Sequence, residues 1–269
     1  MLHFDSTSGQ APLSERVLWL ARRSASSIPY AIGQRRIGRR YRLNDGFERV
    51  YLHHTRKTGG TSLSESFLTL GGEDPLTVKR RMRDGWQMAR TGDFVVTAHH
   101  RRALRRGCYF FGWSHFPAWS VRLPNRTFTV TILRDPEARV LSLYRYLLDP
   151  RADADQPFAA PARERQSAAD GFDRFLDRLA VPELLGQLQM FSRRRDPEEA
   201  AAGIEGCSLA FPVDRMEEGL ATLSKLIGRR LSPRHERRSV ASFEPSDAQR
   251  SRLREALEPE YALMGLLRL

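Results

Sequence analysis

The sequence predicts a single α/β domain with a central, mainly parallel sheet flanked by helices. Its 269 residues suit one large domain of this kind. With 41% apolar and 28% charged residues, the composition is that of a globular protein with a sizeable core. Strand patterns alternate with helical patterns along the chain, and this order favours parallel strands covered by helices on both faces.

The first half of the domain begins with a strand, a tight turn and a helix. Residues 49–53 favour a strand, a Gly-Gly turn follows, and residues 62–70 have apolar side chains at helical spacing. Residues 75–92 are expected to form a basic helix. Residues 94–97 and 108–112 are expected to be short apolar strands.

The second half begins with the strongest strand pattern in the chain, the β-branched run at residues 127–133. Asp135 then suits a helix cap and Pro136 the first helical turn, so a helix is expected over residues 136–148. Residues 149–170 hold few large apolar side chains and are expected to be a mobile insertion, either a lid or a loop. The remaining elements are expected to be helices at 172–179 and 182–191, a strand at 208–213, and helices at 217–227 and 246–269.

Basic residues are concentrated in two stretches of the chain. Residues 1–45 are expected to be a basic N-terminal extension to a domain at 46–269, and residues 16–42 hold eight Arg and no acidic residue. Such an arm could make weak contact with an anionic membrane surface. Residues 79–106 hold nine Lys or Arg against two Asp, and the net charge is +12. An anionic partner is expected, although charge alone does not separate nucleotide, glycan, membrane and nucleic acid.

Membrane-spanning and metal-binding patterns are missing from the sequence. The apolar runs are much shorter than the roughly 18 residues of a spanning helix, and no run resembles a signal-peptide core. Cys108 and Cys207 form neither a disulfide framework nor a spaced ligand pair. We therefore expect a cytoplasmic protein without a bound metal.

The turn after the first strand has the composition of an anion-binding loop, and its sequence is Lys57-Thr58-Gly59-Gly60-Thr61-Ser62. Glycines at a helix N-terminus let backbone N–H groups approach a phosphate or sulfate closely. The hydroxyls and the lysine add donors, and the chain contains only three lysines among its 44 basic residues. A plain turn with a hydroxyl helix cap is the simpler alternative. Because the lysine precedes the glycines, the order is the reverse of Walker A, which disfavours a magnesium-dependent ATPase or kinase.

Two strings in the sequence resemble motifs of one enzyme family. The run from His54 to Leu63, His-Thr-Arg-Lys-Thr-Gly-Gly-Thr-Ser-Leu, resembles the His-Ile-Pro-Lys-Thr-Gly-Gly-Thr-Ser motif of carbohydrate sulfotransferases that use 3′-phosphoadenosine 5′-phosphosulfate (PAPS). Thr-Arg replaces Ile-Pro here. The run from Leu133 to Tyr144 is similar to the family's Leu-Arg-Asp-Pro-x-x-Arg-x-x-Ser motif, and Gly186-Gln187-Leu188-Gln189 and residues 234–239 show weaker similarity.

The resemblance implies a P-loop-like sulfotransferase fold and a role for each motif. The loop from Lys57 to Ser62 would bind the 5′-phosphosulfate end of PAPS. Arg134 and Ser142 would bind its 3′-phosphate. The implied reaction is transfer of a sulfuryl group to a hydroxyl of a carbohydrate, with Lys57 and the loop amides stabilising charge on the sulfuryl group and the leaving phosphate.

Histidine is the natural candidate for the general base that would remove the acceptor's proton. His115 lies in a segment similar to the family's Gly-His-Phe-Pro, with Trp113-Ser114 inserted between Gly and His. His99, His100 and His54 remain alternatives, as does a carboxylate.

Two other functions remain open from the sequence. The basic surface could make the protein a non-catalytic module that binds nucleic acid or an acidic glycan, and an atypical nucleotide kinase is a third possibility. For the sulfotransferase, the partners are expected to be the nucleotide donor and a glycan acceptor, with no nucleic acid. Basic residues 79–106 favour an acidic glycan.

Overall fold

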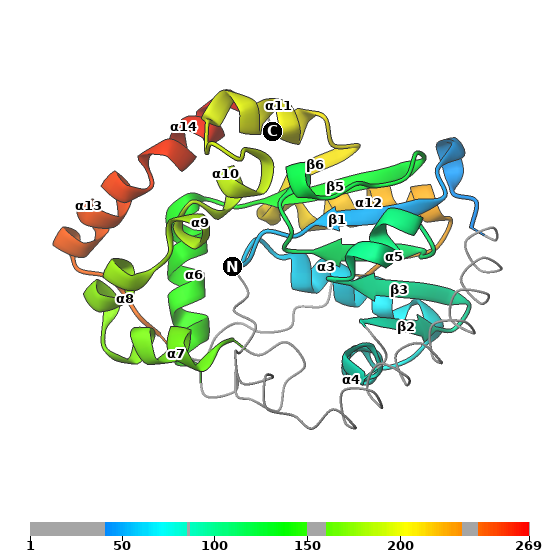
Figure 1. Cartoon of the computed structure of the whole chain (residues 1–269), viewed down its shortest axis with the longest axis horizontal. Helices are drawn as coiled ribbons and strands as arrows, with labels where there is room; N and C mark the ends of the chain where they lie inside the picture. The colour runs from blue at the N-terminus through cyan, green and yellow to red at the C-terminus, as the bar shows by residue number, and fades with distance from the viewer. Residues whose placement is uncertain (1–40, 85–86, 150–159, 233–241, 269) are drawn as a thin grey trace, which may run out of the picture. The chain divides into compact units, whose positions relative to one another are not determined.

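The α/β architecture expected from the sequence is confirmed by a computed structural model that describes residues 41–84, 87–149, 160–232 and 242–268. The described strands form a six-stranded sheet in the order β2-β3-β4-β1-β5-β6 (Figure 1). Neighbouring strands are parallel, except that β2 runs antiparallel to β3. The strands are β1 Arg49–His53, β2 Met88–Thr91, β3 Phe94–Ala98, β4 Phe111–Ser114, β5 Thr127–Leu133 and β6 Leu209–Pro212.

Helices follow most of the strands and flank the sheet, with α6 leading away from the end of β5 and α12 packing against β6 (Figure 1). The described helices are α3 Gly60–Leu68, α4 Pro75–Asp84, α5 Arg101–Arg106, α6 Pro136–Leu148, α7 Ala162–Ala169, α8 Phe172–Arg178, α9 Val181–Leu184, α10 Gly186–Phe191, α11 Pro197–Glu205, α12 Met216–Ile227, α13 Asp247–Ala256 and α14 Glu258–Leu266. Short 3-10 turns are η2 Asn44–Gly46, η3 Thr69–Gly71, η4 Ala118–Ser120 and η6 Val213–Arg215.

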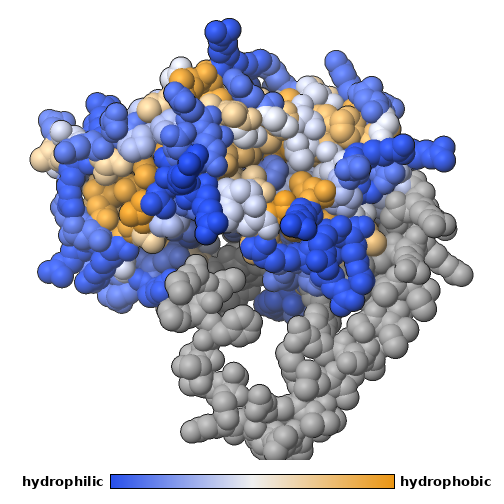
Figure 2. All heavy atoms as spheres, turned by 45° about the horizontal axis from the view of Figure 1, so that its top comes forward, coloured by the Kyte–Doolittle hydropathy of each residue, from blue (hydrophilic) through white to orange (hydrophobic). Residues whose placement is uncertain are grey.

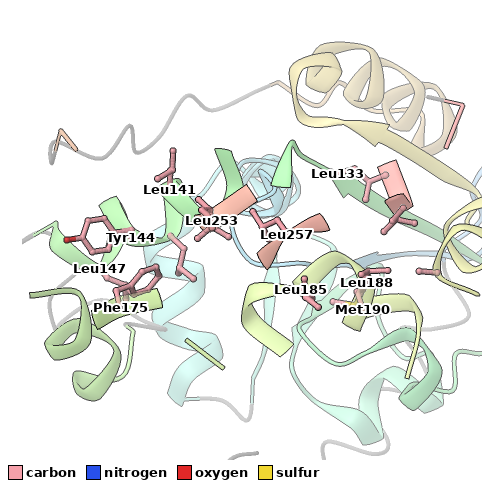
Figure 3. Packing of buried hydrophobic residues seen from close by; sticks show 14 of the residues in the cluster. Leu133, Leu141, Tyr144, Leu147, Phe175, Leu185, Leu188, Met190, Leu253 and Leu257 are labelled. Carbon is pink, nitrogen blue, oxygen red and sulfur yellow. The ribbon is translucent and has the colours of Figure 1, made fainter. Parts of the chain in front are cut away.

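A hydrophobic cluster joins α6 to the helices that follow it. Tyr144 and Leu147 of α6 pack in the same buried cluster as Phe175 of α8, together with Leu253 of α13 and Leu257 between α13 and α14 (Figure 3). The aromatic rings of Tyr144 and Phe175 lie 5.1 Å apart between centroids. Burial of these apolar side chains fixes α6, and therefore the end of β5, relative to α8, α10 and α14.

Strand β5 and helix α6 have the bounds that the sequence predicts, whereas the helix predicted for residues 75–92 is wrong in its second half. Helix α4 ends at Asp84, and Met88–Thr91 is an edge strand. Thr91 is fully buried and its hydroxyl donates to Leu68 O at 2.6 Å, and Gly92 makes the hairpin turn with φ 54°. The sequence pattern did not indicate this strand, because the strand includes a basic residue, Arg90, that is exposed on the edge of the sheet.

Other element boundaries also differ from the prediction. Strand β4 begins three residues later than expected, and helices α5 and α11 were not predicted. The helix expected at 246–269 is split at Leu257, because Pro259 lies in the first turn of a new helix and lacks the N–H that would continue the old one. The helix expected at 182–191 is likewise split into α9 and α10.

The two segments predicted to be irregular are only partly described. The second part of the 149–170 insertion is helical, since α7 packs Ala168 into the buried cluster, and residues 150–159 lie outside the described residues. At the N-terminus, Tyr41 is buried with its ring centroid 5.0 Å from that of Phe110. Residues 1–40, and with them the basic arm, also lie outside the described residues, as do residues 233–241 with the weak motif at 234–239.

Hydrophilic side chains dominate the face shown in Figure 2, with smaller hydrophobic patches between them. In the described ranges, every helix is too short or too polar to cross a membrane.

Candidate functional site

Four of the candidate residues lie side by side at one edge of the sheet. His99, His115, His54 and Arg134 each directly follow a strand, in the sheet order β3, β4, β1 and β5. The register aligns these ends, because Ala98 pairs with Trp113, and His53 pairs with both Ser114 and Thr131. Carboxyl ends of adjacent parallel strands are the usual place for a binding site in such a sheet.

The loop between β1 and α3 is shaped by its two glycines. Gly59 has a left-handed backbone with φ 91°, and a methyl group there would lie 2.7 Å from Val213 Cγ2. A methyl group at Gly60 would lie 2.1 Å from His54 Cδ2. Lys57 is also left-handed, with φ 68°. The glycines are therefore required both for the backbone turn and for close packing.

The hydroxyl groups of the loop differ in their surroundings. Thr58 is buried, and its Oγ1 donates to Thr55 O at 2.9 Å, so this hydroxyl braces the loop from inside. Thr61 is exposed and Ser62 half-buried in the first turn of α3. The residue at the cap position, directly before this helix, is Gly59, so no side chain caps its first turn. The first turn of α3 thus combines uncapped backbone N–H groups with two hydroxyls, which is the chemistry of an anion site at a helix N-terminus.

Arg134, at the junction between β5 and α6, contacts this loop. Its Nη1 donates to Lys57 O at 3.1 Å. Gln187 holds the Arg134 backbone on both sides, accepting from Arg134 N at 2.9 Å and donating to Arg134 O at 3.0 Å. Burial, together with Arg145 and Arg139, lowers the pKa of Arg134. A desolvated guanidinium beside other cations is stabilised by an anion.

Helix α6 places a second set of groups beside the loop. Lys57 Nζ lies 4.2 Å from the centre of the Tyr146 ring. Ser142 is half-buried one turn before Tyr146, and residues four apart lie on the same face of a helix. Ser142 therefore lies on the same face of α6 as Tyr146, whose ring contacts Lys57.

A buried polar network lies behind Arg134. Gln187, Glu260 and Arg139 have no exposed surface. Glu260 accepts from Gln187 N at 2.6 Å and from Gln187 Nε2 at 3.1 Å, and it lies 3.5 Å from Arg139 Nη2. This network ties α14 and α10 to the start of α6. The weak similarity around Gln187 was the sequence signal for this network, and no sequence pattern indicated Glu260.

Three of the four histidine candidates form a cluster. The ring centroid of His115 lies 4.5 Å from that of His54 and 4.8 Å from that of His99. His115 Nδ1 donates to His54 O at 2.6 Å, which leaves Nε2 as the ring's acceptor. His115 is exposed, whereas His99 is half-buried and His54 buried. His100 instead caps α5 by accepting from Ala103 N at 2.9 Å.

Desolvation keeps the cluster neutral. Although solvent reaches His115, the protein atoms around it lower its pKa to about 4. Burial lowers the pKa of His99 to about 3 and that of His54 well below 6.5, and the positive charge of a protonated neighbour acts in the same direction. At pH 7 all three rings are uncharged, and an uncharged ring has the lone pair that a general base needs.

Arg56, at the position where the resembling motif has proline, makes contacts that the sequence did not indicate. Its guanidinium lies 2.9 Å from Glu164 Oε2 of α7 and 3.1 Å from Glu183 Oε2 of α9. The arginine therefore anchors the loop through ion pairs to two helices, in place of a stiff proline ring.

Among the described residues, no group of three His, Cys, Asp or Glu side chains is arranged to hold a metal ion. No protein-family model and no curated protein matches the chain.

Proposed function

We propose that the protein is a sulfotransferase that moves a sulfuryl group from PAPS to a hydroxyl of a carbohydrate acceptor. The observation that carries this proposal is the contact between two strand-to-helix junctions, where Arg134 Nη1 donates to Lys57 O at 3.1 Å. Because β1 and β5 are neighbours, two anion-binding groups from distant parts of the sequence lie together. Such a pair suits a nucleotide that is phosphorylated at two positions.

In the proposed complex, the 5′-phosphosulfate lies against the first turn of α3, where backbone N–H groups, Thr61, Ser62 and Lys57 surround it. Arg134 and Ser142 bind the 3′-phosphate. One hydrogen bond supports the assignment of backbone N–H groups to the first phosphate site and of side chains to the second: Asp135 Oδ1 already accepts from Ala138 N at 2.7 Å. The N-terminus of α6 therefore has its own cap, and the second junction contributes side chains rather than backbone.

The proposed reaction is an in-line displacement at sulfur. The acceptor oxygen forms a bond to sulfur while the bond between sulfur and the phosphate oxygen breaks, and 3′-phosphoadenosine 5′-phosphate (PAP) leaves with the electron pair. His115 Nε2 takes the hydroxyl proton, and Lys57 and the loop amides stabilise the charge on the leaving phosphate. The hydrogen bond from His115 Nδ1 to His54 O supports this role, because it orients the ring. His54 and His99 remain alternatives within the cluster, and a carboxylate outside it.

The second candidate function, polyanion binding without catalysis, has one observation in its favour. Helix α5 exposes four arginines to solvent, Arg101, Arg102, Arg105 and Arg106. Binding through such a surface would weaken steeply with salt and survive Lys57→Ala. Magnesium-dependent ATP turnover would instead indicate the atypical kinase.

A cytoplasmic location and a metal-free reaction stay part of the sulfotransferase proposal.

Calorimetry with PAP tests the proposal directly. We expect the wild type to bind PAP and Arg134→Ala to bind it roughly 10- to 100-fold more weakly, since a hydrogen bond to a charged group is worth about 1.5–3 kcal/mol. Arg126→Ala is the matched control, because the Arg126 side chain is 70% exposed at the opposite end of β5. Adenosine 5′-phosphate, which lacks the 3′-phosphate, should bind weakly to all three proteins. Absence of PAP binding, or equal binding by Arg134→Ala, would overturn the proposal.

A further inference from the structure

The segment that follows His115 presents an aromatic ring to solvent. Trp119, in η4, is 46% exposed and is one of three large apolar side chains with this degree of exposure in the described residues, with Val181 and Leu266. Its Nε1 donates to Gln189 O at 3.3 Å. The indole is thus held in one orientation against α10 while a large part of it remains open.

Two exposed arginines accompany the aromatic residues of this segment. The guanidinium of Arg193 lies 5.8 Å from the centre of the Trp119 ring. That of Arg101 lies 4.0 Å from the centre of the Phe116 ring, and Arg101 Nη1 donates to Ser120 O at 2.8 Å. Neither arginine forms an ion pair with a carboxylate of the described chain. Both side chains are exposed, so a ligand can reach them.

The segment lies close to the proposed base. Trp119 is four residues from His115, so their Cα atoms are at most ~15 Å apart. Gln189, whose carbonyl holds the Trp119 ring, is two residues from Gln187, which holds Arg134. Helix α10 therefore contacts both the proposed donor site and the aromatic segment.

We infer that Trp119, Arg193 and Arg101 form an acceptor subsite for an acidic sugar. This inference rests on the proposed function. The apolar face of a sugar ring suits an exposed indole, and guanidinium groups bind carboxylate or sulfate in bidentate fashion. A sugar unit bound there would belong to the same glycan as the sugar unit whose hydroxyl group reaches His115. A nucleic acid also stacks on aromatic rings beside arginines, and the experiment separates the two.

The test measures binding of two hexasaccharides to the full chain by calorimetry in the presence of PAP. One is unsulfated and contains uronic acid, as hyaluronan does, and the other is a neutral maltohexaose. We expect the acidic sugar to bind more tightly, and Trp119→Ala and Arg193→Ala each to weaken its binding by about tenfold while PAP binding is unchanged. Two matched controls are expected to have no effect. Leu266→Ala changes an exposed leucine at the end of α14, and Arg229→Ala changes an exposed arginine two residues after α12.

The outcomes distinguish the inference from the proposed function. If PAP binds but the Trp119 and Arg193 variants bind the acidic sugar as well as the wild type does, the subsite is overturned and the donor site stands. Equal binding of the neutral sugar, or tighter Trp119-dependent binding of a single-stranded oligonucleotide, also overturns it. If PAP does not bind but the acidic sugar binds through Trp119 and Arg193, the sugar-binding site stands, whereas its role as an acceptor subsite and the sulfotransferase proposal both fail.

Discussion

The two strand-to-helix junctions of the site lie next to each other but are built in different ways. The junction from β1 to α3 turns through the left-handed Gly59 and leaves the first helical turn without a side-chain cap. The junction from β5 to α6 has Asp135 as a cap and Pro136 in its first turn. The first junction therefore leaves backbone N–H groups without a side-chain cap, whereas the second caps its own helix and adds the Arg134 side chain. Under the proposed function, the two neighbouring junctions would bind anions by different chemistry.

Gly60→Ala is expected to break the first junction and to have the largest effect on donor binding. Because the added methyl would lie 2.1 Å from Cδ2 of the buried His54 ring, the loop or the ring must move. Overpacking of this kind costs about 1–3 kcal/mol, and we expect PAP binding to fall at least about tenfold. Urea unfolding and PAP calorimetry measure the two effects.

Gly265→Ala in α14 is the matched control for Gly60→Ala, since a methyl group there meets no atom within 4 Å. It is expected to raise the free energy of unfolding by about 0.5–1 kcal/mol and to leave PAP binding unchanged. Unchanged PAP binding by Gly60→Ala would show that the loop does not hold the donor.

Acid is expected to weaken the first junction more than the second, because β1 ends in His53 and β5 ends in Leu133. Burial lowers the pKa of His53 from 6.5 to about 4, so the folded state disfavours the protonated ring. Protonation of the unfolded chain therefore lowers the free energy of unfolding once the pH falls below 6.5, and this loss grows until the pH reaches about 4. Between pH 7 and pH 5 the free energy of unfolding should fall by about 2 kcal/mol through His53 alone.

His53→Phe tests the acid effect, because it removes the titrating group and keeps an aromatic ring against Tyr51 and Phe191. Urea unfolding at pH 7 and pH 5 should show a loss about 2 kcal/mol smaller than in the wild type. His100→Asn, which keeps a capping group on α5, should change the loss much less. An identical pH dependence for His53→Phe and the wild type would mean that His53 is protonated as easily in the folded state as in the unfolded state.

Local sequence rules predicted the second junction to the residue and the first only in part. A β-branched run, an Asp cap and a Pro at the helix start act over a few positions, so β5 and α6 follow from the sequence. The Gly-Gly turn after β1 was also predicted from local composition. Its contact with Val213 was not, because that residue follows β6, far along the chain.

The arrangement of the candidate site depends on strand order, which no local pattern encodes. His99, His115 and His54 meet because β4 lies between β3 and β1, and the sequence left these histidines as separate alternatives. The network behind Arg134 joins Gln187 to Glu260, 73 positions apart. A buried glutamate of this kind looks like an ordinary helical surface residue in the sequence, since only the fold supplies its partners.

Asp135→Ala sharpens the comparison with the smallest expected effect. Loss of the cap on α6 should lower the free energy of unfolding by about 1 kcal/mol, as measured by urea unfolding, while Asp135→Asn keeps the cap and most of the stability. Asp196→Ala, which removes the corresponding cap from α11, should cost a similar amount. Neither Ala variant should change PAP affinity by more than about twofold, because the second junction would bind the donor through the Arg134 side chain. If Asp135→Ala lost as much PAP affinity as Arg134→Ala, donor binding at both junctions would depend on an ordered helix N-terminus. The proposed difference between the two junctions would then disappear.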